Sequence, residues 1–85
     1  MTQTIQLSVE DKPGVLMRVV GIITAKGANI QSLSVRPDTQ QAGISLVTLV
    51  AEIEPRLNAR VVNEMNRLVQ VLEAVDVSEE AACLH

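Results

Sequence analysis

Apolar and polar side chains alternate along part of this chain, as they do in a strand with one covered face. In residues 4–9 the apolar positions are Ile5, Leu7 and Val9, each followed or preceded by a polar residue. Successive side chains of a strand point to opposite faces, so this segment predicts a strand that is covered on one side. Residues 44–53 (ISLVTLVAEI) are largely apolar on both faces, which predicts a central strand.

Two other segments carry apolar residues at helical spacing. The first set is Leu16, Val19, Val20 and Ile23, and the second is Leu57, Val61, Met65 and Leu68. Gly27 suits the end of the first helix, and Pro55 suits the beginning of the second. Gly21 lies inside the first helix, where a missing side chain favours the close approach of another backbone.

Shorter apolar patterns complete the chain. Leu33 and Val35 alternate, but Ile30 is out of phase with them, so we expect a bulge near residues 31–32. A polar turn follows from Pro37 to Gln41, and residues 71–77 (VLEAVDV) predict a last short strand.

The predicted order is strand, helix, strand, strand, helix, strand. Short hairpins and right-handed crossovers fold this order into an α+β, ferredoxin-like βαββαβ domain with a four-stranded antiparallel sheet. Both helices then lie on one face of that sheet. We assign residues 1–78 to this single domain and residues 79–85 to a C-terminal tail. With 47% apolar residues in a small chain, we expect the other face or an edge of the sheet to meet another subunit.

Composition excludes several classes of function. The chain has no Phe, Tyr or Trp and a net charge of −3, whereas nucleic-acid binders need stacking aromatics and a basic surface. The only cysteine and histidine, Cys83 and His85, lie in the tail, which argues against a disulfide, a zinc site or a catalytic Cys/His pair. No apolar stretch approaches a membrane span. We expect a cytoplasmic protein, or a plastid or mitochondrial one with its targeting segment removed, and no catalytic site.

The segment from Asp11 to Gly14 is the strongest candidate for a binding site. One interpretation is structural: the Asp11 carboxylate caps the first helix. The other is functional, because Gly14 lets a ligand approach the backbone N–H groups of Gly14, Val15 and Leu16, and a helix N-terminus attracts anions. A carboxylate beside an anion site would suit both charges of a free amino acid.

The segments "DKPGVLMRV" and "KGANI" resemble the ACT domain, a small regulatory module of amino-acid metabolism. The longer segments "PGVLMRVVGIITAKGANIQSLSV" and "NRLVQVLEAVDVSE" are similar to the regulatory small subunit of acetohydroxyacid synthase, also called acetolactate synthase. The similarity spans residues 5 to 78, and family members that bind valine often have Asn where this chain has Asp11.

The resemblance implies a homodimer or higher oligomer whose two sheets join side by side into eight strands. A regulatory amino acid, usually valine, would lie at the interface between subunits. Asp11 would bind its ammonium group and the amides of Gly14, Val15 and Leu16 its carboxylate. Asn29 and Ile30 would come from the partner chain, with Ile30 and Leu33 against an aliphatic side chain.

The resemblance also implies a function. The chain would be a non-catalytic regulatory subunit in valine, leucine and isoleucine biosynthesis that activates a catalytic large subunit. That large subunit would carry thiamine diphosphate, Mg²⁺ and FAD, and this chain would bind none of them. Two alternatives remain: a free-standing ACT module that senses an amino acid for another protein, and an oligomerisation module without a ligand.

Overall fold

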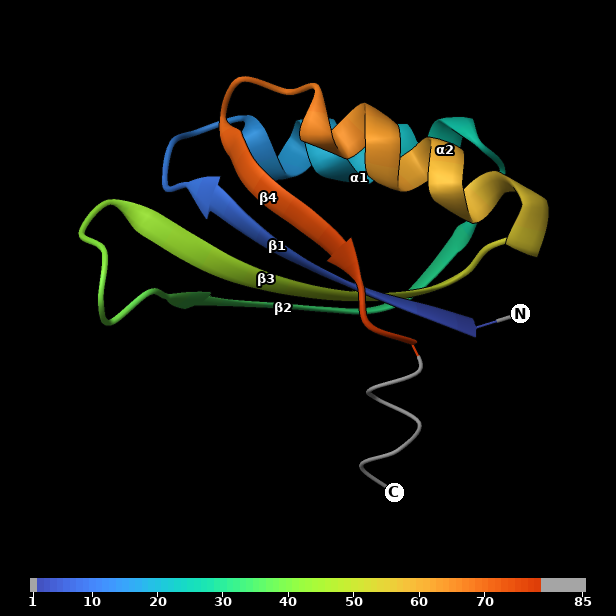
Figure 1. Cartoon of the computed structure of the whole chain (residues 1–85), viewed down its shortest axis with the longest axis horizontal. Coiled ribbons are helices and arrows are strands. Elements are labelled where there is room, and N and C mark those ends of the chain that lie inside the picture. Colours follow the sequence, from blue (N-terminus) through green and yellow to red (C-terminus); the bar gives the residue numbers. More distant parts are fainter. Residues whose placement is uncertain (1, 79–85) are drawn as a thin grey trace.

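The computed structural model describes residues 2–78; Met1 and residues 79–85, with Cys83 and His85, lie outside the described part. The elements follow the predicted order (Figure 1). They are β1 (Thr2–Glu10), α1 (Val15–Ala25), β2 (Asn29–Pro37), β3 (Ile44–Glu52), α2 (Pro55–Asn66) and β4 (Val71–Asp76).

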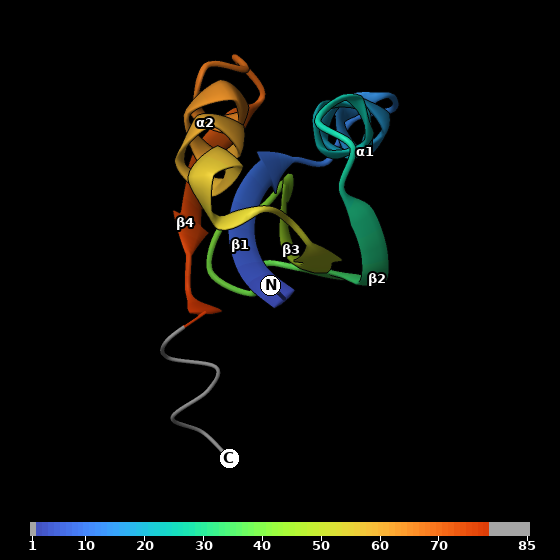
Figure 2. The same cartoon turned by 90° about the vertical axis from the view of Figure 1, so that its right-hand side faces the viewer.

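The strands form one antiparallel sheet in the order β2-β3-β1-β4. Both helices lie on the same face of this sheet, and no helix among residues 2–78 lies over the opposite face (Figures 1 and 2). The ferredoxin-like βαββαβ fold predicted from the sequence is therefore confirmed.

The core lies between the sheet and the two helices. In β1 the alternating residues Ile5, Leu7 and Val9 are buried, as predicted. Every second residue of β3 is also buried, while the residues between them are half-buried, so β3 is the central strand that its sequence indicates. The helices contribute five buried residues, namely Val15, Val19, Ile23, Val61 and Met65.

The register of β2 shifts between Ile30 and Ser32, which confirms the predicted bulge. Beyond the bulge, Leu33 and Val35 stand opposite Leu49 and Val47 on the helix side of the sheet. They nevertheless remain 37% and 48% exposed, because β2 is an edge strand with no neighbour on its outer side.

The two edges of the sheet differ. The outer edge of β4 lies beside α2, whose Asn66 side chain hydrogen-bonds the backbone of this strand. The outer backbone groups of β2 have no partner within residues 2–78. A free strand edge is a template for pairing with another chain, so this domain offers one such edge at β2.

The expectation for Gly21 is wrong within one chain. A Cβ atom added at Gly21 would have no heavy atom within 4 Å outside its own helix, so no other backbone among the described residues approaches it. Gly21 lies on the exposed side of α1.

Candidate functional site

The connection from β1 to α1 is held mainly by backbone hydrogen bonds. The Asp11 N–H donates to the Gly43 carbonyl at 2.8 Å, which ties the connection to the turn between β2 and β3. The Lys12 N–H donates to the Glu10 carbonyl at 2.9 Å. These contacts fix the path of the chain as it leaves the sheet and enters the helix.

Gly14 is the residue immediately before α1. It has φ 88° and ψ −18°, a left-handed conformation that glycine adopts more easily than other residues. No side chain caps the helix at this end. The structural interpretation of Asp11 as a helix cap is therefore wrong. Asp11 is exposed, and its carboxylate accepts no hydrogen bond from the backbone N–H groups at the start of α1.

Without a cap, backbone donors remain available at the start of α1. The first helical bond runs from the Arg18 N–H to the Gly14 carbonyl at 3.1 Å. The N–H groups of Gly14, Leu16 and Met17 have no acceptor within residues 2–78, whereas that of Val15 makes a long bond to the Lys12 carbonyl at 3.4 Å. Unpaired amides at a helix N-terminus are suited to bind a carboxylate.

The sequence indicated the amides of Gly14, Val15 and Leu16. The structure leaves two of these donors free and adds the Met17 N–H, which the sequence reasoning missed. The four-residue spacing of helical hydrogen bonds is the signal that could have found it, because the third residue of any helix also lacks an internal acceptor.

A hollow of about 70 Å³ adjoins this connection. It is lined by Asp11, Val15 and Leu16 on one side and by Val35, Ser45 and Val47 of the sheet on the other. Val35 was not among the predicted site residues. The sheet contributes two valines and Ser45, and the connection contributes the charged residues Glu10, Asp11 and Lys12, so the lining combines aliphatic side chains with charged groups of both signs.

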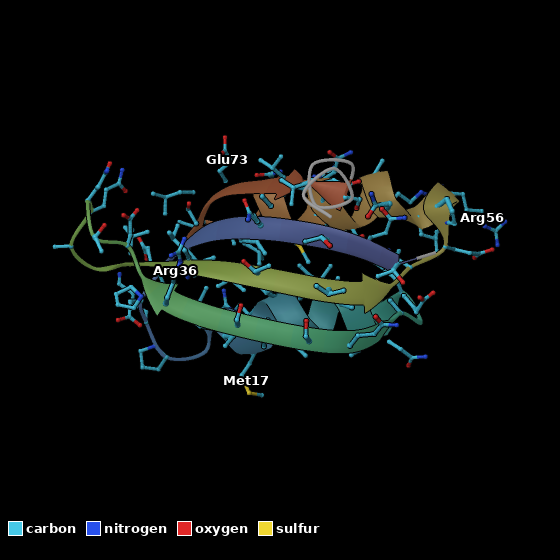
Figure 3. All side chains as sticks on the ribbon, turned by 90° about the horizontal axis from the view of Figure 1, so that it is seen from below. Met17, Arg36, Arg56 and Glu73 are labelled. Atoms are coloured by element: carbon cyan, nitrogen blue, oxygen red, sulfur yellow. The ribbon has the colours of Figure 1, made fainter. Side chains whose placement is uncertain are left out.

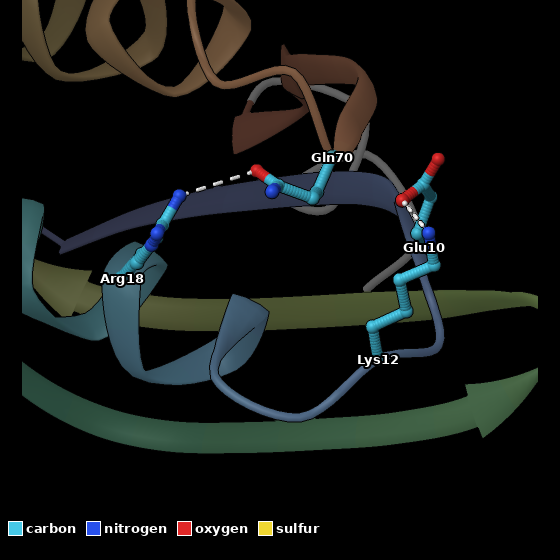
Figure 4. A network of polar contacts seen from close by, with 4 residues as sticks. All are labelled: Glu10, Lys12, Arg18 and Gln70. Carbon is cyan, nitrogen blue, oxygen red and sulfur yellow. Dashed lines mark hydrogen bonds and ion pairs between the residues drawn. The ribbon is translucent and has the colours of Figure 1, made fainter.

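Two basic residues flank the start of α1 (Figure 4). Lys12 Nζ lies 3.2 Å from a carboxylate oxygen of Glu10. Arg18 Nη1 donates to Gln70 Oε1 at 3.5 Å, which links α1 to the loop before β4. Gln70 is neutral, and Arg18 forms no ion pair within residues 2–78.

Asn29 and Ile30 lie at the other end of α1. The helix ends in three backbone bonds: the Lys26 and Ala28 N–H groups donate to the Ile23 carbonyl, and the Gly27 N–H donates to the Thr24 carbonyl. This pattern, with Gly27 at φ 77°, reverses the chain into β2. Asn29 is exposed at the first position of β2, and Ile30 is half-buried against the core.

One chain therefore does not bring the six predicted residues together. Eleven helical residues span about 16 Å, and this length separates Asn29 and Ile30 from the connection that holds Asp11, Gly14, Val15 and Leu16. A single site would need residues from two chains.

The described residues hold no group of three side chains that could ligate a metal ion. None of the helices among them is long and apolar enough to cross a membrane.

Comparison with known proteins identifies the family. Residues 5–73 match the model of the AHAS small subunit-like ACT domain, where AHAS is acetohydroxyacid synthase. The chain is 38% identical over 79 residues to the acetolactate synthase small subunit of Mycolicibacterium smegmatis, and this stretch covers 93% of this chain and 46% of that protein. It is 35% identical over 81 residues to a probable acetolactate synthase small subunit of Archaeoglobus fulgidus, covering 95% of this chain and 50% of that protein. The chain thus spans about half the length of the curated relatives it matches.

Solved structures show the same fold. The acetolactate synthase small subunit of Thermotoga maritima superposes with a TM-score of 0.77 at 21% identity, covering 89% of this chain and 47% of that one. The ACT domain of the GTP pyrophosphokinase of Chlorobium tepidum gives a TM-score of 0.73 at 17% identity, covering 89% and 96%. On the sequence match and the shared fold, the chain belongs to the family of AHAS small subunit-like ACT domains.

Proposed function

We propose that this chain is a non-catalytic regulatory subunit of acetohydroxyacid synthase that binds a branched-chain amino acid between two copies of itself. Its family and its relatives' names support the regulatory role. The observation that carries the proposal is the free outer edge of β2. This strand begins at Asn29 and ends at Pro37, close to the uncapped start of α1, so its two ends hold the two separate groups of predicted site residues.

The free edge of β2 gives the geometry of the pair. If two copies join their β2 strands antiparallel about a two-fold axis, Asn29 of one copy comes to the Pro37 end of the other. The hollow beside Asp11 includes Val35, two residues before Pro37. Pairing therefore brings Asn29 and Ile30 of the second copy toward Asp11, Gly14, Val15 and Leu16 of the first.

The same pairing would cover apolar surface. Leu33 and Val35 are exposed on the helix side of β2, where the partner's strand and helix would exclude water from them. Burial of apolar surface contributes about 25 cal/mol per Å², so these side chains favour association through β2. The contact of α2 with the other edge supports β2 as the edge that pairs.

The chemistry of the site suits an aliphatic amino acid such as valine. The Asp11 carboxylate would bind the ammonium group, and the free amides at the start of α1 would bind the carboxylate. Ile30 and Leu33 would contact the aliphatic side chain. Asn29 would add an amide hydrogen bond from the partner.

The catalytic chemistry belongs, in this proposal, to a large subunit that carries thiamine diphosphate, Mg²⁺ and FAD. The regulatory chain would activate that subunit, and binding of valine would change the activation. Coupling between two such sites is usually about 1–3 kcal/mol, or roughly 5- to 150-fold in affinity.

Reconstitution tests the proposal. Purified catalytic subunit is assayed for acetolactate formation with and without this chain, in the presence and absence of valine. We expect a higher rate with the chain and co-elution of the two proteins on gel filtration. An unchanged rate together with separate elution would refute the regulatory role.

A calorimetric titration of the chain alone with valine, leucine, isoleucine, serine and phenylalanine tests the ligand separately. Heat with the branched-chain amino acids supports the proposed site. Binding of serine or phenylalanine alone would instead favour a free-standing sensor for another protein.

A further inference from the structure

The sheet face opposite the helices carries one charged side chain on each edge strand (Figure 3). Arg36 lies on β2 and Glu73 on β4, and both are exposed. Neither side chain forms an ion pair or a hydrogen bond within residues 2–78. Two opposite charges thus stand without partners on the same face.

The strand register places the two charges in one row across the sheet. Arg36 is opposite Leu46, Leu46 is opposite Ser8, and Ser8 is opposite Glu73. These residues are on the open face because their neighbours Leu7, Val47 and Ala74 are buried in the core. Three strand spacings separate the ends of the row, which corresponds to about 14 Å.

The centre of this face is shallow and uncharged. The next row consists of Ser34, Thr48, Gln6 and Val75. A hollow of about 200 Å³ lies over the two rows. Leu46 and Ser8 stand side by side in it, a large side chain next to a small one.

The row from Arg36 to Glu73 is complementary in charge and in side-chain size to the same row of a second copy. Consider a second copy related by a two-fold axis that runs along the strands, midway between β1 and β3. The rotation exchanges the two edges of the sheet, so Arg36 of each copy lies over Glu73 of the other. It also exchanges the two central positions, so Leu46 of each copy lies over Ser8 of the other and enters the hollow.

We propose that the open face of the sheet binds the open face of a second copy of this chain, with two reciprocal Arg36–Glu73 ion pairs at its edges. Packed sheets lie about 10 Å apart, a distance that these side chains span together. An isologous contact of this kind closes after two copies.

The size of the face predicts a weak contact. Four strands and about six residues along each give a face of roughly 19 by 20 Å, or about 400 Å² for each copy. Stable interfaces cover about 800 Å² of each partner, so the association depends on protein concentration and on salt. The β2 edge stays free in this pair, so a chain that also pairs through β2 forms species larger than a dimer.

Charge reversal tests the contact. Sedimentation velocity is measured on the full chain over a range of concentrations, at low and at high salt. The variants R36E and E73R each place like charges over each other, and we expect the dissociation constant of the contact to rise at least about tenfold. Two copies joined through their β2 strands form a β2-edge pair. In both variants we expect the species larger than this pair to disappear.

Mixing the two variants gives the decisive measurement. R36E carries two acidic residues in the row and E73R carries two basic ones, so an equimolar mixture restores both ion pairs between unlike chains. We expect the mixture to recover the association of the original chain. Recovery cannot come from refolding of either variant, so it separates the contact from a general loss of stability.

R56E is the matched control. Arg56 lies on α2, away from the open face (Figure 3), and its side chain is 78% exposed. This variant changes the net charge by the same amount as R36E and should leave association unchanged. The proposal is overturned if R36E and R56E weaken association equally, or if the mixture associates no better than its components. Either result leaves the β2-edge pair and its ligand, which are tested by reconstitution and calorimetry, unaffected.

Discussion

The side-chain amide of Asn66 binds both backbone groups of Ala74. Asn66 Oδ1 accepts the Ala74 N–H at 2.9 Å, and Asn66 Nδ2 donates to the Ala74 carbonyl at 3.0 Å. The amide thereby replaces a neighbouring strand at the middle of β4. Nδ2 also donates to the Val62 carbonyl at 3.1 Å, which holds the side chain on its helix.

Asn66→Ala should lower the free energy of unfolding by about 1–3 kcal/mol, because it leaves the edge groups of Ala74 without their partner. Urea unfolding followed by far-UV circular dichroism measures this loss. Asn63→Ala is the control, since Asn63 is an exposed residue of the same helix whose side chain forms no hydrogen bond within residues 2–78. Equal midpoints for the two variants would contradict the role of Asn66.

Gly14→Ala should destabilise the chain by about 1–2 kcal/mol, because an alanine must adopt the left-handed conformation at the start of α1. The cost is conformational, since an added Cβ at Gly14 has no neighbour within 4 Å.

Gly21→Ala should have the opposite effect on stability. Gly21 is inside α1 with ordinary helical φ, so alanine should stabilise the chain by up to about 1 kcal/mol. Thermal unfolding of the two variants gives the sign of each change, and a loss of stability in Gly21→Ala would point to a partner at that position.

Asp11→Ala should weaken the binding of valine about tenfold or more while the free energy of unfolding stays within about 0.5 kcal/mol of the original. The carboxylate caps no helix, so its removal costs the fold little, whereas the ammonium group of the ligand loses its counter-charge. Isothermal titration calorimetry measures the affinity and urea unfolding the stability. Unchanged affinity would exclude Asp11 from the site, and a large loss of stability would restore a structural role.

Asp76 should make stability depend on pH in the acidic range. Burial raises the pKa of Asp76, but hydrogen bonds from the Ser78 hydroxyl, the Ser78 N–H and Asn58 outweigh this effect, so the pKa lies below its ordinary value of 3.8. A group whose pKa is lower in the folded state stabilises the fold above its unfolded pKa. This stabilisation is lost as the pH falls below about 3.8 and through the folded value.

The measurement is the urea midpoint between pH 6 and pH 2.5. Asp76→Asn should show a smaller decrease over this range than the original chain. Asp11→Asn, measured without amino acid present, is the control, because it removes an exposed carboxylate that accepts no hydrogen bond within residues 2–78. A decrease of the same size in Asp76→Asn would assign the acid sensitivity to other groups.

Much of the fold could be predicted because each helix and strand shows a pattern of apolar residues within a short stretch of sequence. The alternation of Ile5, Leu7 and Val9 and the helical spacing of Val19 and Ile23 each need only a few neighbouring residues. The slip in phase after Ile30 likewise marks the bulge directly. The order of these elements then limits the topology to a few choices.

The site could be predicted less completely because it depends on where individual groups point. A carboxylate at position 11 suits a cap by sequence spacing alone, yet the residue at the cap position is Gly14 and no side chain caps the helix. Val35, which lines the same hollow as Asp11, is exposed because the order of the strands places β2 at an edge of the sheet. The Asn66–Ala74 contact joins a helix to a strand after a loop, and no local pattern indicates it.

The hydrogen bond from the Asp11 N–H to the Gly43 carbonyl has a practical consequence for measuring ligand binding. The chain has no Trp, Tyr or Phe, so it offers no intrinsic fluorescence that a bound amino acid could change. The Asp11 amide is a natural spectroscopic reporter instead, because its proton is shielded by a bond that spans the two loops beside the hollow. Its hydrogen–deuterium exchange rate would register any ligand that tightens or opens this connection, without a label or a substitution.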